Sequence, residues 1–150
     1  MKKLIGLGVL LVACRGGSMS STPTPSAGTT GGVGAATART AVDAFMAAVK
    51  AEDLQALGAI WGTQQGPARE QMSRADLEMR EYYIVKCLRH DKYTILSDAG
   101  APAGARVFTV QLTYGPLTRS TNFSLVPGPQ NRWYVRDVEL KQVDDICLKR

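Results

Sequence analysis

The chain has 150 residues, a length that fits one folded domain, and a composition typical of globular proteins, 45% hydrophobic and 21% charged. Its formal charge is +5, but the basic residues are scattered and most have an acidic neighbour, as in Arg69-Glu70, Arg74-Asp76 and Arg136-Asp137. A nucleic-acid-binding domain would show a basic stripe interleaved with aromatic residues. The sequence has no such stripe, so we do not expect nucleic acid as a partner.

The chain begins with the pattern of a secretory signal. Lys2 and Lys3 form a positive segment, and residues 4–12 form an apolar run that is too short for a spanning helix of about 20 residues. This run leads into Leu-Val-Ala-Cys at 11–14, which resembles the lipobox of bacterial lipoproteins. The resemblance implies that residues 1–13 are a cleaved signal peptide and that Cys14 carries a diacylglycerol and usually a further acyl chain, such as palmitate. The alternative is a plain secretory signal in which Cys14 is incidental.

Two or more acyl chains on Cys14 would hold the protein stably at a membrane. The residue that follows is Arg15 rather than Asp. Because Asp at this position tends to retain lipoproteins in the inner membrane of enteric-type bacteria, the resemblance favours the outer membrane. The folded domain would then lie in the periplasm or at the cell surface.

Residues 14–37 are expected to form a flexible tether. Sixteen of the 22 residues at 15–36 are Gly, Ser, Thr or Pro, and Arg15 is the only charged one. Such a segment buries too little apolar surface to offset the entropy of ordering it. As a flexible coil it would span about 25 Å and separate the membrane from a single domain at residues 38–150.

Helical periodicity starts at the end of this tether. Thr40 and Asp43 predict a capping box, followed by a helix with an apolar face formed by Val42, Phe45, Met46 and Val49. Asp53 is predicted to cap a short second helix, whose apolar face comprises Leu54, Leu57, Ile60 and Trp61.

A third helical region is expected after a break at 62–66. Pro67 suits its first position, because proline has no backbone N–H to leave unsatisfied there. Ser73 and Asp76 are predicted to re-cap it, and it continues through Met79, Tyr83 and Cys87.

After His90 the apolar period changes from 3.6 to 2, which predicts strands. Four strands are expected, at 92–97, 106–114, 117–126 and 132–140, separated by turns rich in Gly and Pro. Helices followed by a meander of strands predict an α+β fold, with the N-terminal helices packed on a curved four-stranded antiparallel sheet.

This order of elements resembles the nuclear transport factor 2-like domains of the cystatin-like superfamily, and in particular their small bacterial lipoproteins. The segments that carry the resemblance are AVDAFMAAVKAEDLQALGAIWG at 41–62 and RWYVRDVEL at 132–140. The resemblance implies helices across a curved sheet, with a cone-shaped space between them. It does not select a function, because this fold hosts isomerases, cyclases, dehydratases, transport adaptors and domains of no known activity.

Two cysteines remain if Cys14 is lipidated. An exported chain is in surroundings that permit disulfides, so Cys87 and Cys147 are predicted to pair and to join the C-terminal tail to the third helix. A catalytic thiol is the alternative, because His90 follows Cys87 by three residues. A metal site would need more ligands than the single histidine of the chain provides, so we expect no metal and no cofactor.

His90 and Asp137 are the two weak candidates for catalysis. His90 could act as a general base oriented by Asp91, but its polar surroundings favour an exposed residue in a turn. Asp137 shares strand parity with Trp133 and Val135, which would direct its carboxylate inward, as in the Asp base and Tyr donor of ketosteroid-isomerase-like relatives. The opposite parity, with Tyr134, Val138 and Leu140 inward, would leave Asp137 in water.

Aromatic residues are the candidates for lining a pocket between helices and sheet, and core packing is the alternative role for each of them: Trp61, Tyr83, Tyr114 and Trp133. No set of catalytic partners is fixed by spacing, so the sequence favours a membrane-anchored, non-enzymatic envelope domain that binds a small apolar ligand or a partner protein. The alternatives are a small cofactor-independent isomerase, cyclase or hydratase acting in the cone, and a purely structural envelope subunit.

Overall fold

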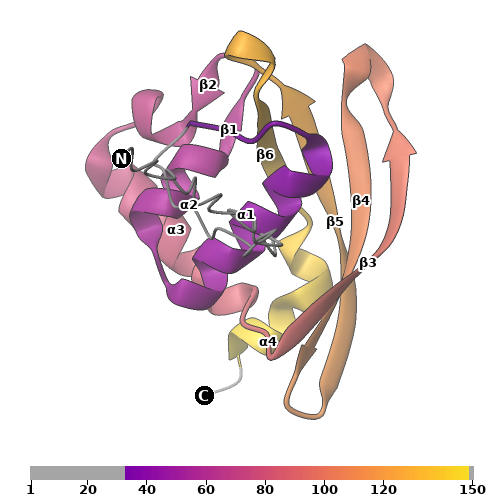
Figure 1. The fold of residues 1–150 in the computed structure, drawn as a ribbon. Helices are drawn as coiled ribbons and strands as arrows, with labels where there is room; N and C mark the ends of the chain where they lie inside the picture. The colour runs from indigo at the N-terminus through magenta and orange to yellow at the C-terminus, as the bar shows by residue number, and fades with distance from the viewer. Residues whose placement is uncertain (1–32, 149–150) are drawn as a thin grey trace, which may run out of the picture.

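The structure of the protein is a computed structural model, and it describes residues 33–148. Helices lie on one face of a four-stranded antiparallel sheet (Figure 1), which confirms the predicted α+β class and the antiparallel sheet. The predicted leader, Cys14 and residues 15–32 of the tether lie outside the described residues.

The elements follow one another in the predicted order, helices first. The helical half comprises α1 (Ala38–Ala51), α2 (Leu54–Ile60), β1 (Gly62–Thr63), β2 (Gly66–Pro67), η1 (Ala68–Glu70) and α3 (Arg74–Cys87). The second half comprises β3 (Lys92–Gly100), η2 (Pro102–Gly104), β4 (Arg106–Tyr114), β5 (Leu117–Pro127), η3 (Pro129–Asn131), β6 (Trp133–Val138), η4 (Leu140–Val143) and α4 (Asp144–Leu148).

Helix α1 begins three residues earlier than the sequence predicted. Thr37, not Thr40, is its N-cap, and the backbone N–H and side-chain oxygen of each threonine bond the other at about 3 Å. The capping box at Thr37 and Thr40 forms in place of the predicted one at Thr40 and Asp43, because the earlier start of the helix buries Ala38 and Ala41 in the core. Asp43 has a different role, since its carboxylate accepts a hydrogen bond from the Tyr93 hydroxyl at 2.8 Å.

The other caps differ less from expectation. Asp53 caps α2 as predicted, with Oδ1 accepting the N–H of Ala56 at 2.9 Å. Ser73 caps α3 as predicted, and its Oγ accepts the N–H of Asp76. Pro67 does not open a helix: it ends β2, because its extended backbone pairs with Gly62 before η1 starts.

The sheet has the order β3-β4-β5-β6, with every neighbouring pair antiparallel. Strand β3 continues to Gly100, beyond the predicted end at 97, because its last residues pair with the start of β4. Strand β6 is shorter than the predicted 132–140. It ends at Val138 because the next N–H, of Glu139, turns to the carbonyl of Asn122 at 3.0 Å and η4 follows.

The hydrophobic core lies between the helical layer and one face of the sheet. At its centre, the rings of Phe45 in α1 and Phe123 in β5 meet edge to face, with centroids 5.8 Å apart. Both are fully buried, and burial of one such ring contributes roughly 2 to 3 kcal/mol. The core therefore fixes α1 across the middle of the sheet.

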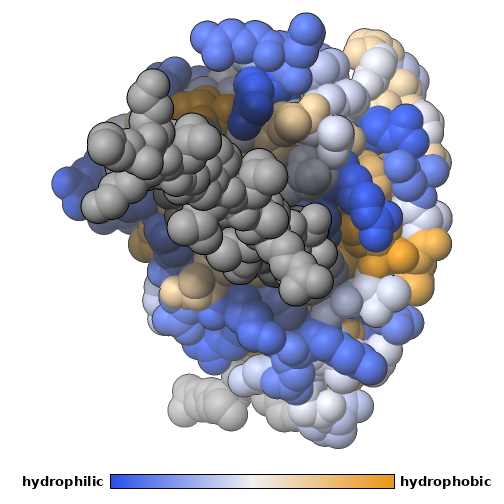
Figure 2. All heavy atoms as spheres, in the orientation of Figure 1, coloured by the Kyte–Doolittle hydropathy of each residue, from blue (hydrophilic) through white to orange (hydrophobic). Residues whose placement is uncertain are grey.

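The two edges of the sheet differ. Residues 33–37, which the sequence assigns to the tether, cover β6, since Ala35 pairs with Trp133, and Trp61 forms a further bridge to Val135. No segment of the described chain pairs with the outer edge of β3, whose register shifts at Leu96, a residue with an exposed side chain. Figure 2 shows an apolar cluster over this edge. A bulge of this kind discourages the edge from pairing with another chain.

Cys87 and Cys147 lie at disulfide distance, with sulfur atoms 1.98 Å apart, which confirms the predicted pairing. The bridge joins the last residue of α3 to α4, and both cysteines are buried. The C-terminal segment is therefore part of the folded domain.

We expect the loss of this bridge to lower the free energy of unfolding by about 4 kcal/mol, because it closes a loop of 60 residues in the unfolded chain. Denaturant titration of the full-length protein with and without reductant measures the change. The Cys147→Ser variant is the control, since its midpoint should not respond to reductant. An identical wild-type midpoint in both conditions would contradict the prediction.

Candidate functional site

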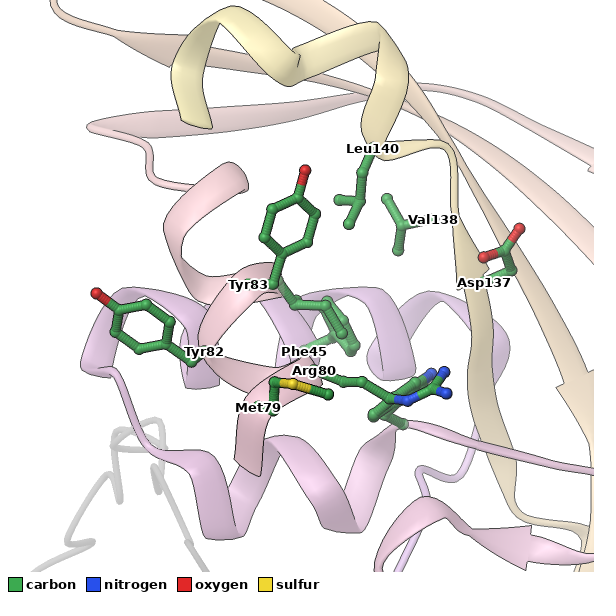
Figure 3. Close-up of a pocket in the computed structure, with 10 residues that line it drawn as sticks. Phe45, Met79, Arg80, Tyr82, Tyr83, Asp137, Val138 and Leu140 are labelled. Carbon is green, nitrogen blue, oxygen red and sulfur yellow. The ribbon is translucent and has the colours of Figure 1, made fainter. Parts of the chain in front are cut away.

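An open apolar groove of about 550 Å³ lies between α3 and the end of β6. Ten residues from four elements and one helix cap line it: Phe45, Trp61, Met79, Arg80, Tyr82, Tyr83, Ile84, Asp137, Val138 and Leu140. Figure 3 shows Tyr83 projecting from α3 toward Leu140, whereas the ring of Tyr82, which also lines the groove, extends outward on the side away from Leu140. A concave, mainly apolar surface with a few polar groups at its rim is typical of a ligand site.

The deep wall of the groove is rigid because the core holds it. Phe45 belongs to the fully buried centre of the domain. Trp61 is the C-cap of α2, where its N–H donates to Leu57, and its indole Nε1 donates to the Arg136 carbonyl at 3.3 Å. A partly buried indole fixed at both backbone and ring gives the groove a preformed aromatic wall.

A bulge in β6 decides which side chains enter the groove. Val135 pairs with Leu125, but Asp137 pairs with Ser124 and Val138 with Phe123, so Arg136 is an extra residue in the strand. Because one inserted residue reverses the alternation, both Val135 and Val138 face the core.

The inward facing of Asp137 that parity with Val135 suggested is therefore wrong. Asp137 is exposed, and its carboxylate lies at the rim on the β6 side (Figure 3). No hydrogen bond or ion pair of Asp137 is present in the described part of the chain. Within the same part of the chain, no tyrosine hydroxyl donates a hydrogen bond to it, as the ketosteroid-isomerase-like arrangement would require.

The outer wall of the groove is unusually apolar for a helix surface. Met79, Tyr82 and Tyr83 are 65%, 64% and 53% exposed, and they occupy neighbouring turns of α3. Contiguous exposed side chains of this size on a soluble domain mark a surface for a ligand or a partner. Arg80 adds a positive charge to the same rim, and no acidic side chain within residues 33–148 pairs with it.

His90 is not the exposed turn residue that its charged neighbours suggested. It is 9% exposed, its Nδ1 donates to the Leu88 carbonyl at 2.9 Å, and its ring meets Tyr93 edge to face. Burial lowers the pKa of His90, which favours the neutral form. The contact with Tyr93 of β3 shields the His90 ring from water, and His90 does not line the groove.

Two of the four aromatic pocket candidates line the groove. Trp61 and Tyr83 do so, whereas Tyr114 and Trp133 lie at opposite ends of the sheet, packed against the margins of the core. Sequence periodicity cannot predict which of these four residues line the groove, because all four lie at apolar positions of their own elements. Their distance from α3 is what differs.

Glu81 is a candidate residue that the sequence reasoning missed. It is 1% exposed on the core side of α3, and its Oε1 has no hydrogen-bond partner in the described part of the chain. Burial, with a smaller contribution from the charge of Glu78, raises the pKa of Glu81 to about 7. A buried carboxyl that titrates near neutrality is a functional-site candidate.

The signal for Glu81 was present in the sequence. It lies four residues after Leu77, and three and four residues before Ile84 and Val85, which places it on the buried stripe of α3. The exposed Met79, Tyr82 and Tyr83 mask this stripe, because they put equally large apolar residues on the opposite side. The helix therefore shows no single apolar face.

Among residues 33–148, no three His, Cys, Asp or Glu side chains gather as a set of metal ligands. Within the same residues, every helix is too short or too polar to cross a lipid bilayer.

Comparison with known proteins adds no relative. No protein-family model, no curated protein and no solved structure matches this chain.

We expect Glu81→Gln to stabilise the protein at pH 8 by about 1 to 2 kcal/mol and much less at pH 4.5. In the folded wild type the Glu81 carboxyl keeps its proton up to about pH 7, whereas in the unfolded chain it loses the proton near pH 4.5. The free energy of unfolding of the wild type therefore falls as the pH rises from 4.5 to 7 and then levels off. The amide cannot ionise, which removes this fall. Denaturant titrations at several pH values measure this fall in the free energy of unfolding, with Glu52→Gln as the exposed control. If the free energy of unfolding varied with pH in the same way for the wild type and for Glu81→Gln, the raised pKa of Glu81 would be refuted.

Proposed function

We propose that this protein is a membrane-anchored envelope lipoprotein whose domain binds a small apolar ligand in the groove beside α3, without catalysing a reaction. The observation that carries this proposal is the groove itself, which combines a fixed aromatic wall at Trp61 with exposed apolar residues on α3. Its volume of about 550 Å³ falls in the range of small-molecule sites.

The chemistry of the lining favours binding over catalysis. Apolar carbon dominates the surface between Phe45, Tyr83 and Leu140, so a ligand gains mainly from leaving water. The charged groups among the described residues that line the groove are Arg80 and Asp137, and within these residues neither makes a hydrogen bond or an ion pair that would orient it for catalysis. Arg80 would suit an anionic head group on an otherwise apolar molecule.

The resemblance to nuclear transport factor 2-like lipoproteins supports the same reading. It would place the binding site between helices and sheet, and the groove opens where α3 meets the end of β6. The lipobox at 11–14 would keep the domain beside a membrane, which is a source of apolar molecules.

A partner protein is a second candidate ligand, and one observation favours it. Tyr82 lines the groove, but its ring extends outward from α3 (Figure 3) and it is 64% exposed, so a small molecule seated deep in the groove would leave much of it in water. A protein segment that lies along α3 would cover Tyr82, Met79 and Tyr83 together.

Tryptophan fluorescence tests the small-ligand proposal directly, because only one of the two tryptophans lines the groove. We expect dibromostearate to quench the emission of the full-length protein in vesicles. The Trp133→Phe variant, which keeps Trp61, should still be quenched, whereas Trp61→Phe should not. Brominated phospholipid in the vesicle is the control for contact with the bilayer, and should not quench.

The matched pair Tyr83→Glu and Leu96→Glu tests the site in the same assay. Both wild-type side chains are 53% exposed, but only Tyr83 lines the groove. A carboxylate at 83 should weaken dibromostearate binding by at least about tenfold, because the ligand would desolvate it. Equal affinities for the two variants would overturn the groove as the site.

Membrane anchoring has its own test. We expect the wild type to partition with membranes and to incorporate a palmitate analogue. The Cys14→Ser variant should not be labelled and should retain residues 1–13, because the proposed lipid attaches at the Cys14 sulfur. Metabolic labelling with fractionation measures both. An unlabelled wild type found in the soluble fraction would refute the anchor.

A further inference from the structure

A second cavity, of about 480 Å³, lies on the other side of α3, where this helix faces α2 and η1. Six residues line it: Gln55, Arg69, Arg74, Leu77, Glu78 and Glu81. The 3.6-residue period of α3 turns Leu77, Glu78 and Glu81 away from the side of Arg80 and Tyr83. The two cavities share no lining residue, so this one can act independently of the groove.

Two ionisable side chains that line this cavity, Glu81 and Arg69, have no partner among the described residues. Within residues 33–148 neither Glu81 nor Arg69 makes a hydrogen bond or an ion pair through its side chain, and they do not pair with each other. Both nevertheless lie over Gly58 of α2: a Cβ atom there would be 2.5 Å from Oε1 of Glu81 and 3.6 Å from Cβ of Arg69. A carboxyl that is 1% exposed and unpaired is costly to keep in a core.

The other charges around the cavity are already matched. Arg74 Nε donates to Glu78 Oε1 at 2.6 Å, and this pair is solvent-exposed. Helix α2, which faces Glu81, has the sequence LQALGAI and no ionisable side chain. Among the described residues the cavity therefore offers a ligand one unpaired carboxyl, that of Glu81, and one unpaired guanidinium, that of Arg69.

We propose that this cavity binds a small zwitterion that carries a primary ammonium and a carboxylate, of the α-amino acid class. The Glu81 carboxylate accepts the ammonium N–H groups, and the Arg69 guanidinium donates to the ligand carboxylate. Leu77 supplies an apolar wall for a small side chain, and the Gln55 amide is the remaining neutral hydrogen-bonding group.

Gly58 fits this role. Glycine inside a helix is less stable than alanine by roughly 0.5 to 1 kcal/mol, so its presence in α2 needs a reason. An alanine Cβ would meet the carboxyl oxygen of Glu81 at 2.5 Å and push it aside. The absence of a side chain at 58 lets the carboxyl lie against α2, at a position that Cβ of Arg69 also approaches.

Isothermal titration calorimetry of the full-length protein tests the proposal, with L-alanine, methylammonium, acetate and glycine betaine as probes. L-alanine should bind, and each of the other three probes should bind at least about tenfold more weakly. Methylammonium and acetate each lack one of the two charges, and glycine betaine has no N–H to donate. Glu81→Gln and Arg69→Gln should each weaken L-alanine binding at least about tenfold, and Glu52→Gln should not.

A second readout separates binding from a change in folding. The pKa of Glu81 is raised to about 7, so at pH 6 the ammonium must displace its proton. Titrations in two buffers of different ionisation enthalpy should therefore show proton release for the wild type and none for Glu81→Gln.

Four results would overturn the proposal: no L-alanine binding up to about 10 mM, methylammonium binding as tightly as L-alanine, unchanged affinity in both variants, or binding without proton release. None of them bears on the groove, because the difference in dibromostearate quenching between Trp133→Phe and Trp61→Phe reports on Trp61, which does not line this cavity.

Discussion

The bond between Cys87 and Cys147 is the constraint on which the arrangement around α3 depends. It ties the last residue of α3 to α4, and α4 is held in turn by Ile146 in the core and by the ion pair of Asp145 with Arg119 at 2.6 Å. A helix fixed in this way can carry a cavity on each side. An α3 free to roll would let its exposed tyrosines collapse into the groove, because burial of apolar surface is favourable wherever it is found.

Helix α3 departs from the usual distribution of side chains in both directions. It exposes Met79, Tyr82 and Tyr83, and it buries Glu81, whose Oε1 has no hydrogen-bond partner within residues 33–148. Each departure costs free energy in the isolated domain, either by leaving apolar surface in water or by desolvating a carboxyl. Departures of this kind are expected where a protein binds something, since a ligand can supply the missing contact. Both proposed sites follow from this one helix.

The end of β6 shows how a small irregularity shapes a surface. The extra residue Arg136 turns Val138 toward the core and leaves Asp137 at the rim. The buried hydroxyl of Thr121 holds the next residue by donating to the Glu139 carbonyl at 2.8 Å, so η4 starts at a fixed point and brings Leu140 to the groove. A regular strand would have placed Asp137 inside and removed part of the apolar wall.

The sequence by itself determined the elements whose signals are local. Asp53 and Ser73 mark helix starts because their side chains satisfy nearby N–H groups, and the alternation in 106–114 gives that strand its full length. The pairing of Cys87 with Cys147 was also predicted from the sequence, on the expectation of an exported chain whose third cysteine, Cys14, is lipidated, and the structure places the two sulfur atoms at bonding distance. Tertiary structure alone decided the burial of His90, the facing of Asp137, the separation of Tyr114 and Trp133 from the groove, and the unpaired state of Glu81. Each of these depends on what a neighbouring element places against the residue, and contacts between segments distant in the chain leave no period in the sequence.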